Sequence, residues 1–263
     1  MEQFAAIVVI YNKRCEESLT CCALSNMNDI KVLIYDNSTS DFFNEQYCKA
    51  KGWTYLGGMG NIGISKAYNT CINHLSKENF DGMVCLFDDD TNIDENYFCY
   101  LREAVKASFN KIFVPLIYSA NELLSPCILK KGHKVERFCN GQAAIEYAGN
   151  DISAINSCMA INMTVFKNYR YDENIFLDGV DHHFVTDMRA QGENITVFEY
   201  RCNHNFSGVE HPSKKAAINR FKIYAKDYRY ILKNDKLSYF KLVGKRALSL
   251  CFKYKTLIFL SYL

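Results

Sequence analysis

The stretch MVCLFDDD, at residues 83–90, joins five apolar side chains directly to three carboxylates. A short apolar run of this kind, bounded by polar residues, is typical of a buried strand. Three adjacent carboxylates repel one another, and a divalent cation that prefers oxygen ligands, Mg²⁺ or Mn²⁺, offsets this repulsion. The alternative is a strand-to-helix turn in which an acidic residue caps a helix that begins near Asp94.

Similar apolar runs lie on either side of this stretch, at residues 7–11, 31–35 and 112–117, with longer mixed segments between them. Apolar strands that alternate with helical segments predict a parallel sheet buried on both faces. Ligands bind to such a sheet at the carboxyl ends of its strands. We therefore expect an α/β, Rossmann-like fold, with the site formed by the polar residues that follow the strands.

Polar residues follow the first two strands. Asn12 follows the first strand, and Asp36-Asn37-Ser38 follows the second. The Asp36 carboxylate could accept a hydrogen bond from the ring N–H of a pyrimidine, although the same tripeptide also forms Asx-turns that bind no ligand. We expect these residues and the acidic triple at 88–90 to converge on one crevice.

Residues 61–69 open a helix that is predicted over residues 63–75. Asn61 could cap this helix, and Gly63 would let backbone N–H groups approach a ligand closely. The positive end of a helix suits a diphosphate. A capped helix without a ligand is the alternative, and the glycines at 57–60 do not have the spacing of a dinucleotide-binding motif.

The second half of the chain is less regular. Patterning is lost between residues 126 and 150, which predicts an insertion or a substrate loop. It returns at 152–166, in a helix near 181–191 and in a strand at 195–200, and two more helices are predicted at 214–232 and 239–259. We expect one α/β domain over residues 1–211 and a C-terminal helical extension over residues 212–263.

The composition is that of an ordinary globular protein, with 49% hydrophobic residues, 23% charged residues and a net charge of +2. This balance disfavours nucleic acid as a partner. The twelve cysteines lie mostly within apolar segments and form no C-x-x-C pair. We therefore expect reduced core residues and a cytoplasmic location. The N-terminus lacks the basic start and long apolar core of a signal peptide, so we do not expect export.

The C-terminal run at 248–263 is apolar and aromatic, but two lysines interrupt it. It is also shorter than the roughly 20 apolar residues of a membrane-spanning helix. Together with Lys241, Lys245 and Arg246, it suits peripheral contact with an anionic membrane surface on the inner face of the cell membrane. Packing on the domain, or in a homodimer interface, is the alternative.

In order and spacing, these motifs resemble the inverting family 2 glycosyltransferases with the GT-A fold, in particular the rhamnosyltransferase-like members. The resemblance covers about residues 5–229. It is carried by VVIYN at 8–12, DNS at 36–38, the N-x-G-x-x-x-A-x-N pattern at 61–69 and the acidic triple, which matches the family's D-x-D. FLDGVD at 176–181 is similar to the family's acidic motif before the last core helix, and HNFSG at 204–208 is similar to its late histidine and glycine motif.

The resemblance implies transfer of a sugar from a nucleoside diphosphate, first dTDP-rhamnose and otherwise a UDP-hexose. The acceptor would be a glycan or lipid-linked glycan in bacterial surface polysaccharide synthesis. The nucleotide-sugar half would span about residues 1–118 and the acceptor half about 119–211. Asp88 and Asp90, with His204, would hold Mn²⁺ or Mg²⁺ and the ribose-diphosphate, and Asp36 would bind the base. The expected donor-binding residues are Asn12, Asp36, Asn37, Asn61, Gly63, Asn69, Asp88 and Asp89.

An inverting transfer needs a carboxylate opposite the leaving diphosphate that takes the proton of the attacking hydroxyl. The acidic motif offers Asp181, which we prefer, and Asp178. His182 and His183 could contact the acceptor, although relatives often carry glutamate at position 183. Asn156-Ser157 falls where the family places a small polar segment that faces the donor sugar and the acceptor.

Two other functions would use similar residues. A nucleotidyltransferase needs a glycine-rich, arginine-containing loop after the first strand, and residues 11–14 do not provide one. A non-catalytic protein that binds a nucleotide sugar would keep the donor residues and lack a base. The presence of Asp178 and Asp181 argues against this second alternative.

Overall fold

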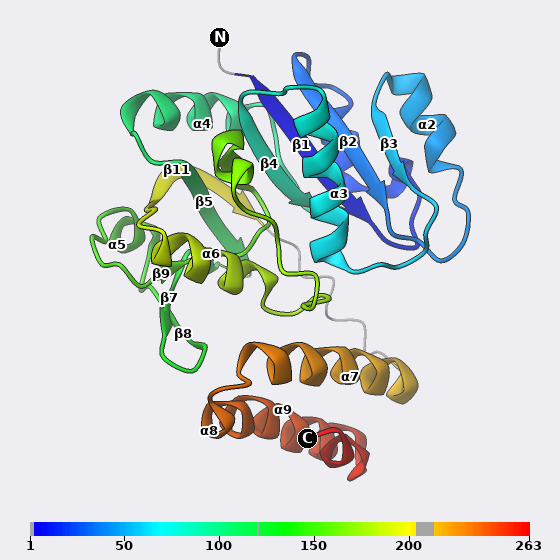
Figure 1. The fold of residues 1–263 in the computed structure, drawn as a ribbon, viewed down its shortest axis with the longest axis vertical. Coiled ribbons are helices and arrows are strands. Elements are labelled where there is room, and N and C mark those ends of the chain that lie inside the picture. The colour runs from blue at the N-terminus through cyan, green and yellow to red at the C-terminus, as the bar shows by residue number, and fades with distance from the viewer. Residues whose placement is uncertain (1–2, 120, 204–212) are drawn as a thin grey trace.

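The computed structural model describes residues 3–119, 121–203 and 213–263, and its centre is a sheet with the strand order β11-β5-β10-β4-β1-β2-β3 (Figure 1). The strands are β1 Phe4–Ile10, β2 Ile30–Asp36, β3 Thr54–Gly57, β4 Met83–Asp88, β5 Ile112–Ser119, β10 Met159–Asn162 and β11 Ile195–Asn203. Strands β1 to β4 are parallel to one another, and β11 is parallel to β5. The mostly parallel α/β fold is confirmed. It is interrupted by β10, which runs antiparallel between β4 and β5, and by β6 (Glu122–Ser125), which is antiparallel to β5.

Helices cover both faces of this sheet. On one face lie α3 (Ile64–Lys77) and α6 (Val180–Ala190), and on the other lie α1 (Leu19–Leu24), α2 (Asn44–Lys51) and α4 (Asn96–Ala107). Strand β1 shows why both faces are covered. Its successive side chains point to opposite faces of the sheet, and both sets are apolar. Ala5 and Ile7 belong to the core under α3, whereas Ala6 and Val8 belong to the core under α4. A strand that is apolar on both faces must be covered on both faces.

Residues 126–150, for which the sequence predicts an insertion or a substrate loop, contain regular structure that the pattern did not reveal. The segment contains β7 (Cys127–Lys130), β8 (Lys134–Arg137) and α5 (Gly141–Ile145). β7 pairs with β8 and with β9 (Ile152–Ser153) in a small second sheet. These strands are only two to four residues long and β8 is mostly exposed, so they carry no apolar run that the sequence would reveal.

The C-terminal extension is helical, as expected, with its own apolar core. The segments are α7 Lys214–Ile231, α8 Lys236–Tyr239, the π-helical turn Phe240–Gly244, α9 Lys245–Tyr254 and the 3-10 helix Ile258–Tyr262. The single helix expected over 239–259 is therefore wrong, because a π turn interrupts it and it ends at Lys255, whose φ is 49°. Phe221, Tyr224 and Phe259 lie in a core cluster separate from those of the sheet.

All twelve cysteines are free thiols, and nine of them are buried. The prediction of core cysteines does not hold for Cys22, Cys99 and Cys139, which are exposed. Within the described ranges, no helix is long and apolar enough to cross a bilayer.

Candidate functional site

Strand register places the predicted donor residues along one edge of the sheet. Ile10 pairs with Asp36, Val9 pairs with Asp88, and Asp36 pairs with Gly57 on the outer strand β3. The carboxyl ends of β1, β2, β3 and β4 therefore meet in register. As the sequence predicted, Asp36 and Asp88 lie at the same edge, on either side of the end of β1.

Asp36 lines a cavity of about 680 Å³ at this edge. The side chain is only 4% exposed, and its carboxylate accepts hydrogen bonds from the Asn44 side chain at 2.8 Å and the Tyr55 hydroxyl at 3.4 Å. Burial and the neighbouring Asp36 carboxylate raise the pKa of Tyr55 far above its ordinary value, so Tyr55 keeps its proton and remains a donor. The other Asp36 oxygen accepts from the Ser38 backbone N–H at 3.0 Å, which is the Asx-turn of the alternative. The cavity that Asp36 lines is large enough for a nucleobase.

Asn12 and Asn37 hold the loops around this cavity. The Asn12 backbone N–H donates to Ser38 Oγ at 2.8 Å, and its side-chain oxygen accepts from the backbone N–H of Thr39 at 3.0 Å. The Asn37 side-chain oxygen accepts from the backbone N–H of Ile62 at 2.8 Å. In the structure, these two amides are engaged with the protein itself.

Residues 61–69 pack against the acidic motif. Asn61 does not cap α3: its side chain accepts the N–H of Gly63, and Gly63 itself is the N-cap residue. Gly63 has a φ of 86°, and a Cβ there would lie 2.7 Å from the ring of Phe176. The next N–H, that of Ile64, donates to the Phe176 carbonyl at 2.7 Å. The start of α3 is thus occupied by protein, which corrects the prediction that it faces a diphosphate.

Asn69, like Gly63, contacts the segment of chain around the acidic motif. It is 4% exposed. Its side-chain oxygen accepts from the backbone N–H of Tyr171, and its side-chain nitrogen donates to the backbone carbonyl of the same residue, each at 2.9 Å. The amide is satisfied within the protein, so Asn69 supports the segment that leads into the acidic motif. It does not present a free polar group to a donor.

The acidic triple forms a half-buried turn at the end of β4. The triple itself does not cap α4, whose N-cap residue is Glu95 and whose first N–H, that of Asn96, donates to the Asp94 carboxylate at 3.0 Å, so the acidic cap of the alternative is present beside the turn. The backbone carbonyl of Asp89 accepts from Ser18 Oγ at 2.7 Å, and its carboxylate pairs with Lys13 at 2.8 Å. Lys13 thus holds the Asp89 carboxylate, and Asp88 and Asp90 remain the cation ligands that the resemblance of the motifs implies.

Two carboxylates at the end of a strand fit a hard divalent cation such as Mn²⁺ or Mg²⁺, which also takes oxygens from a diphosphate. Among the described residues, no group of three His, Cys, Asp or Glu side chains could hold a metal ion. His204 lies outside the described residues. The last residue described before it, Asn203, pairs with Asn92, two positions after Asp90.

Asn156 and Ser157 lie beside the acidic triple. Ser157 Oγ is 2.8 Å from the hydroxyl of Thr91, the residue that follows Asp90. Asn156 is 7% exposed, and its side-chain oxygen is buried without a hydrogen-bond partner in the described part of the chain. A buried acceptor without a donor is costly, and a hydroxyl of a bound sugar would satisfy it.

The two carboxylates of the acidic motif differ in their partners. Both oxygens of Asp178 are bonded by the guanidinium of Arg220 on α7, one of them at 2.7 Å. Asp181, in the first turn of α6, accepts a hydrogen bond from the backbone N–H of His182 at 2.7 Å. Burial, and then the charges of Asp88 and Asp181, raise the pKa of Tyr68 well above its ordinary value. The Tyr68 hydroxyl is buried and has no hydrogen-bond partner among the described residues.

The two histidines point in different directions. His182 Nδ1 is 2.8 Å from Ser153 Oγ, next to the small sheet. His183 Nε2 is 3.7 Å from the Asp187 carboxylate and 4.0 Å from that of Asp172. Of the two residues predicted to contact an acceptor, His183 is thus held by carboxylates of its own helix and of the preceding loop.

The sequence did not single out Asp227, on α7. This carboxylate is fully buried and accepts hydrogen bonds from three successive backbone N–H groups, those of Phe176 at 3.0 Å, and of Leu177 and Asp178, both at 2.8 Å. Together with Arg220, it fixes the acidic motif to the C-terminal extension. An aspartate in the middle of a helix gives no signal in the sequence that would identify such a contact.

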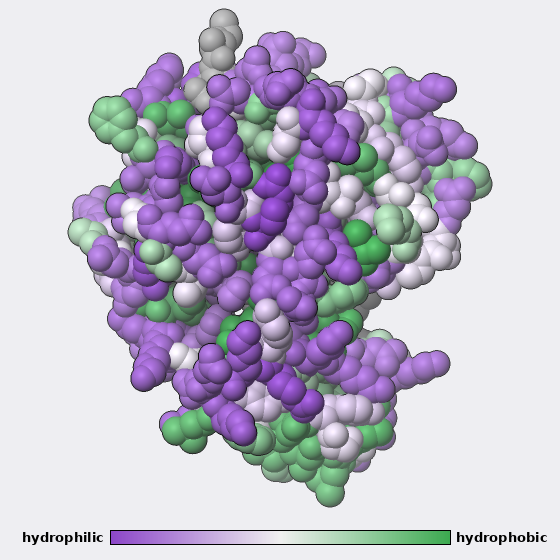
Figure 2. Space-filling view, viewed as in Figure 1, coloured by the Kyte–Doolittle hydropathy of each residue, from purple (hydrophilic) through white to green (hydrophobic). Residues whose placement is uncertain are grey.

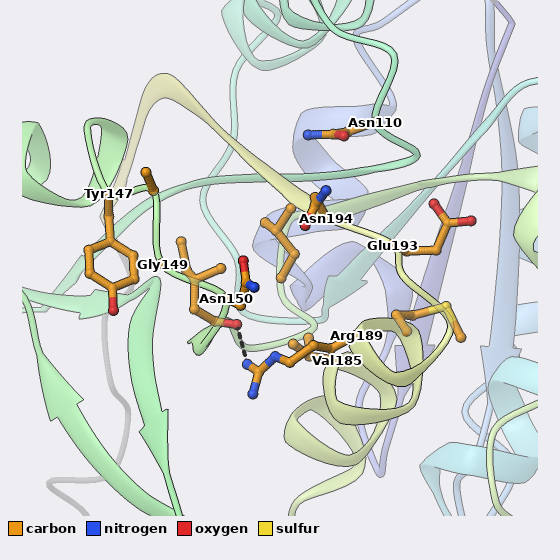
Figure 3. Close-up of a pocket in the computed structure, with 12 residues that line it drawn as sticks. Asn110, Tyr147, Gly149, Asn150, Val185, Arg189, Glu193 and Asn194 are labelled. Atoms are coloured by element: carbon orange, nitrogen blue, oxygen red, sulfur yellow. Dashed lines mark hydrogen bonds between the residues drawn. The ribbon is translucent and has the colours of Figure 1, made fainter.

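A second cavity, of about 290 Å³, lies away from these carboxylates (Figure 3). Asn110 and Asn194 line it just before β5 and β11 begin, so it lies toward the amino ends of the strands. Arg189 points across it and donates to the carbonyl of Ile152 at 2.9 Å. This cavity does not belong to the candidate site.

An α/β/α sandwich with this sheet order and an acidic turn after β4 defines the GT-A fold. The chain is similar to S. aureus TarS 1-349, with a TM-score of 0.54 and 14% identity, over 91% of this chain and 74% of that one. The complex of TarS 1-349 with UDP gives a TM-score of 0.54 and 14% identity, over 86% of this chain and 65% of that one. The mannosyltransferase PcManGT from Pyrobaculum calidifontis, in complex with GDP-Man and Mn²⁺, gives 0.56 and 14%, over 88% of this chain and 64% of that one.

At these identities the likeness establishes the fold alone. No protein-family model matches the chain, and neither does any curated protein sequence.

Proposed function

We propose that this protein is an inverting glycosyltransferase that moves a sugar from a nucleoside diphosphate to a hydroxyl of a carbohydrate acceptor. The observation that carries the proposal is the register-aligned edge of the sheet. There, a cavity lined by Asp36 lies at the same sheet edge as the acidic turn that begins at Asp88. The structures with this fold include complexes with UDP and with GDP-Man.

In the proposed reaction, the acceptor oxygen bonds to the anomeric carbon as the bond from that carbon to the diphosphate oxygen breaks. The nucleoside diphosphate leaves with the bonding electrons, and the configuration at the carbon inverts. Asp181 takes the proton of the attacking hydroxyl. Asp36 accepts a hydrogen bond from the base. A cation held by Asp88 and Asp90 would supply neutralisation of the diphosphate charge.

Asp181 suits the role of base better than Asp178 does. A bidentate pair with arginine holds both oxygens of Asp178, so its electron pairs are engaged. Within the described ranges, Asp181 accepts one hydrogen bond, from its own helix backbone to Oδ1. A carboxylate with an available oxygen can take up a proton at little structural cost.

The donor we propose is a pyrimidine nucleotide sugar, because the ring N–H of uracil or thymine matches the carboxylate in the cavity. The resemblance of the motifs favours dTDP-rhamnose, with UDP-hexoses as the next candidates. The acceptor would be a glycan or lipid-linked glycan of a bacterial surface polysaccharide, and the reaction would take place in the cytoplasm. Residues 1–118 would then bind the donor and residues 119–211 the acceptor.

The test is a thermal-shift panel of UDP, dTDP and GDP and their sugars, with and without Mn²⁺. A ligand that binds the folded state raises the unfolding temperature by mass action. We expect one pyrimidine nucleotide sugar to give the largest rise, and Asp36→Asn to bind it at least about tenfold more weakly, the effect of one lost charge-assisted hydrogen bond. Asp81→Asn, at the amino end of β4, is the matched control and should bind normally. Equal shifts for all nucleotides, or none, would contradict the proposal.

A further inference from the structure

The outer face of the C-terminal helices exposes large apolar side chains. We define this outer face by Leu237, Phe240, Leu248, Phe252 and Leu257, which are between 50% and 83% exposed. The helical period explains this exposure. Buried residues recur every four positions, so the residues on the opposite side of the helix face outward. These inward residues, which belong to the core shared with α7, are Tyr239, Val243, Ala247 and Cys251. The space-filling view shows apolar surface gathered at this end of the molecule (Figure 2).

The C-terminal segment that contains the outer face has an unusual charge. Residues 236–263 carry six basic side chains and no acidic one. Residues 1–235 carry the other 25 basic side chains and all 29 acidic ones, a net charge of −4. The basic residues are Lys236, Lys241, Lys245, Arg246, Lys253 and Lys255. The positive charge of the protein is thus concentrated on the helices that expose the apolar side chains.

We propose that the outer face docks on a membrane surface that contains anionic lipids. Exposed Phe and Leu side chains on a basic, amphipathic helix enter the boundary between headgroups and acyl chains, while the lysines pair with lipid phosphates. This inference deepens the proposed function and rests on it, because it specifies a lipid-linked acceptor. A second copy of the chain is a poorer occupant, because a two-fold interface would bring the same cations face to face without a carboxylate to pair with them.

The outer face is also connected to the candidate site. α7 packs against α8 and α9 in one apolar core, and from α7 Arg220 and Asp227 hold the acidic motif. One helix therefore separates the proposed docking surface from the loop at residues 176–178, which leads into the helix that carries Asp181. An acceptor anchored in the bilayer would be presented next to that loop.

The test is sedimentation of the full chain with vesicles of pure phosphatidylcholine and of equal parts phosphatidylcholine and phosphatidylglycerol. We expect binding to the anionic vesicles only, and weaker binding at high salt. Phe252→Ser should weaken it about tenfold, since Phe252 is 83% exposed and adds apolar area to the contact. Lys241→Gln, Lys245→Gln and Lys253→Gln together should weaken it on the order of a hundredfold, roughly fivefold for each lysine.

Matched controls lie on the other domain. Phe109→Ser removes an even more exposed ring, and Lys49→Gln with Lys77→Gln removes exposed cations of α2 and α3. These variants should bind vesicles as the wild type does. Thermal unfolding checks that each variant is folded, and donor binding without vesicles tests the proposed function separately. Failure to bind anionic vesicles, equal binding to neutral ones, or a dimer that Phe252→Ser dissociates would overturn the docking proposal.

Discussion

At the scale of single residues, the candidate site depends on how neighbouring carboxylates are partnered. Lys13 pairs with Asp89 in the acidic triple, and Arg220 pairs with Asp178 in the acidic motif. In each case a basic residue from a distant part of the chain neutralises one carboxylate. Asp89 and Asp178 are therefore engaged in contacts within the protein.

Asp181→Asn should reduce transfer by about 10²- to 10⁴-fold, because an amide cannot take the acceptor's proton. Donor affinity should stay within about twofold, since the base acts on the acceptor. Initial-rate kinetics and donor titration measure the two effects. Asp178→Asn is the comparison, and it should act mainly through stability because it breaks the pair with Arg220. The assignment is wrong if Asp178→Asn abolishes transfer and Asp181→Asn leaves it substantial.

At the scale of elements, helix α7 belongs to the site although it follows the sheet domain in sequence. Its buried Asp227 accepts three backbone N–H groups of the acidic motif, and the start of α3 holds the same segment through the Phe176 carbonyl. The segment is thus clamped between a helix of the first half of the chain and a helix of the extension. We infer that Asp227 is a positioning residue.

Asp227→Asn should lower the turnover number more than it changes the donor KM. The amide NH₂ would replace one acceptor oxygen and face N–H groups of the acidic motif, which would displace the loop next to Asp181. The loss of folding stability should be about 1–3 kcal/mol, the cost of buried donors left unsatisfied. Steady-state kinetics and urea unfolding measure the two effects. Asp235→Asn is the matched control, since Asp235 caps only α8, and it should spare turnover. Equal kinetic losses in both variants would argue for a merely structural role.

At the scale of the whole molecule, the β7–β8 hairpin connects the second half of the sheet domain to the extension. The ring of His133 packs edge-on against Tyr228 of α7 at 5.9 Å. A Cβ at Gly132 would lie 2.4 Å from Ser238 Oγ, so the turn also lies close against α8. Burial, with smaller contributions from His182 and His183, lowers the pKa of His133 from 6.5 to about 4.

This pKa shift predicts a loss of stability in acid. As the pH falls from 6.5 towards about 4, the unfolded chain binds a proton at His133 before the folded chain does. The free energy of unfolding should therefore decrease over this range, by about 1 kcal/mol after allowance for solvent screening of a partly exposed ring. Urea unfolding at both ends of the range should show a smaller decrease for His133→Gln. An identical decrease in the two proteins would contradict the role given to His133.

The sheet and the edge that carries the candidate site could be predicted from the amino-acid sequence. Apolar runs identify β1, β2, β4 and β5, and strand polarity places Asp36 and Asp88 at one edge, because both effects are local and periodic. The contacts of residues 61–69, Arg220 and Asp227 with the acidic motif could not be predicted and are seen in the folded protein alone. These contacts join residues tens of positions apart, and no local pattern records which buried polar group will meet which.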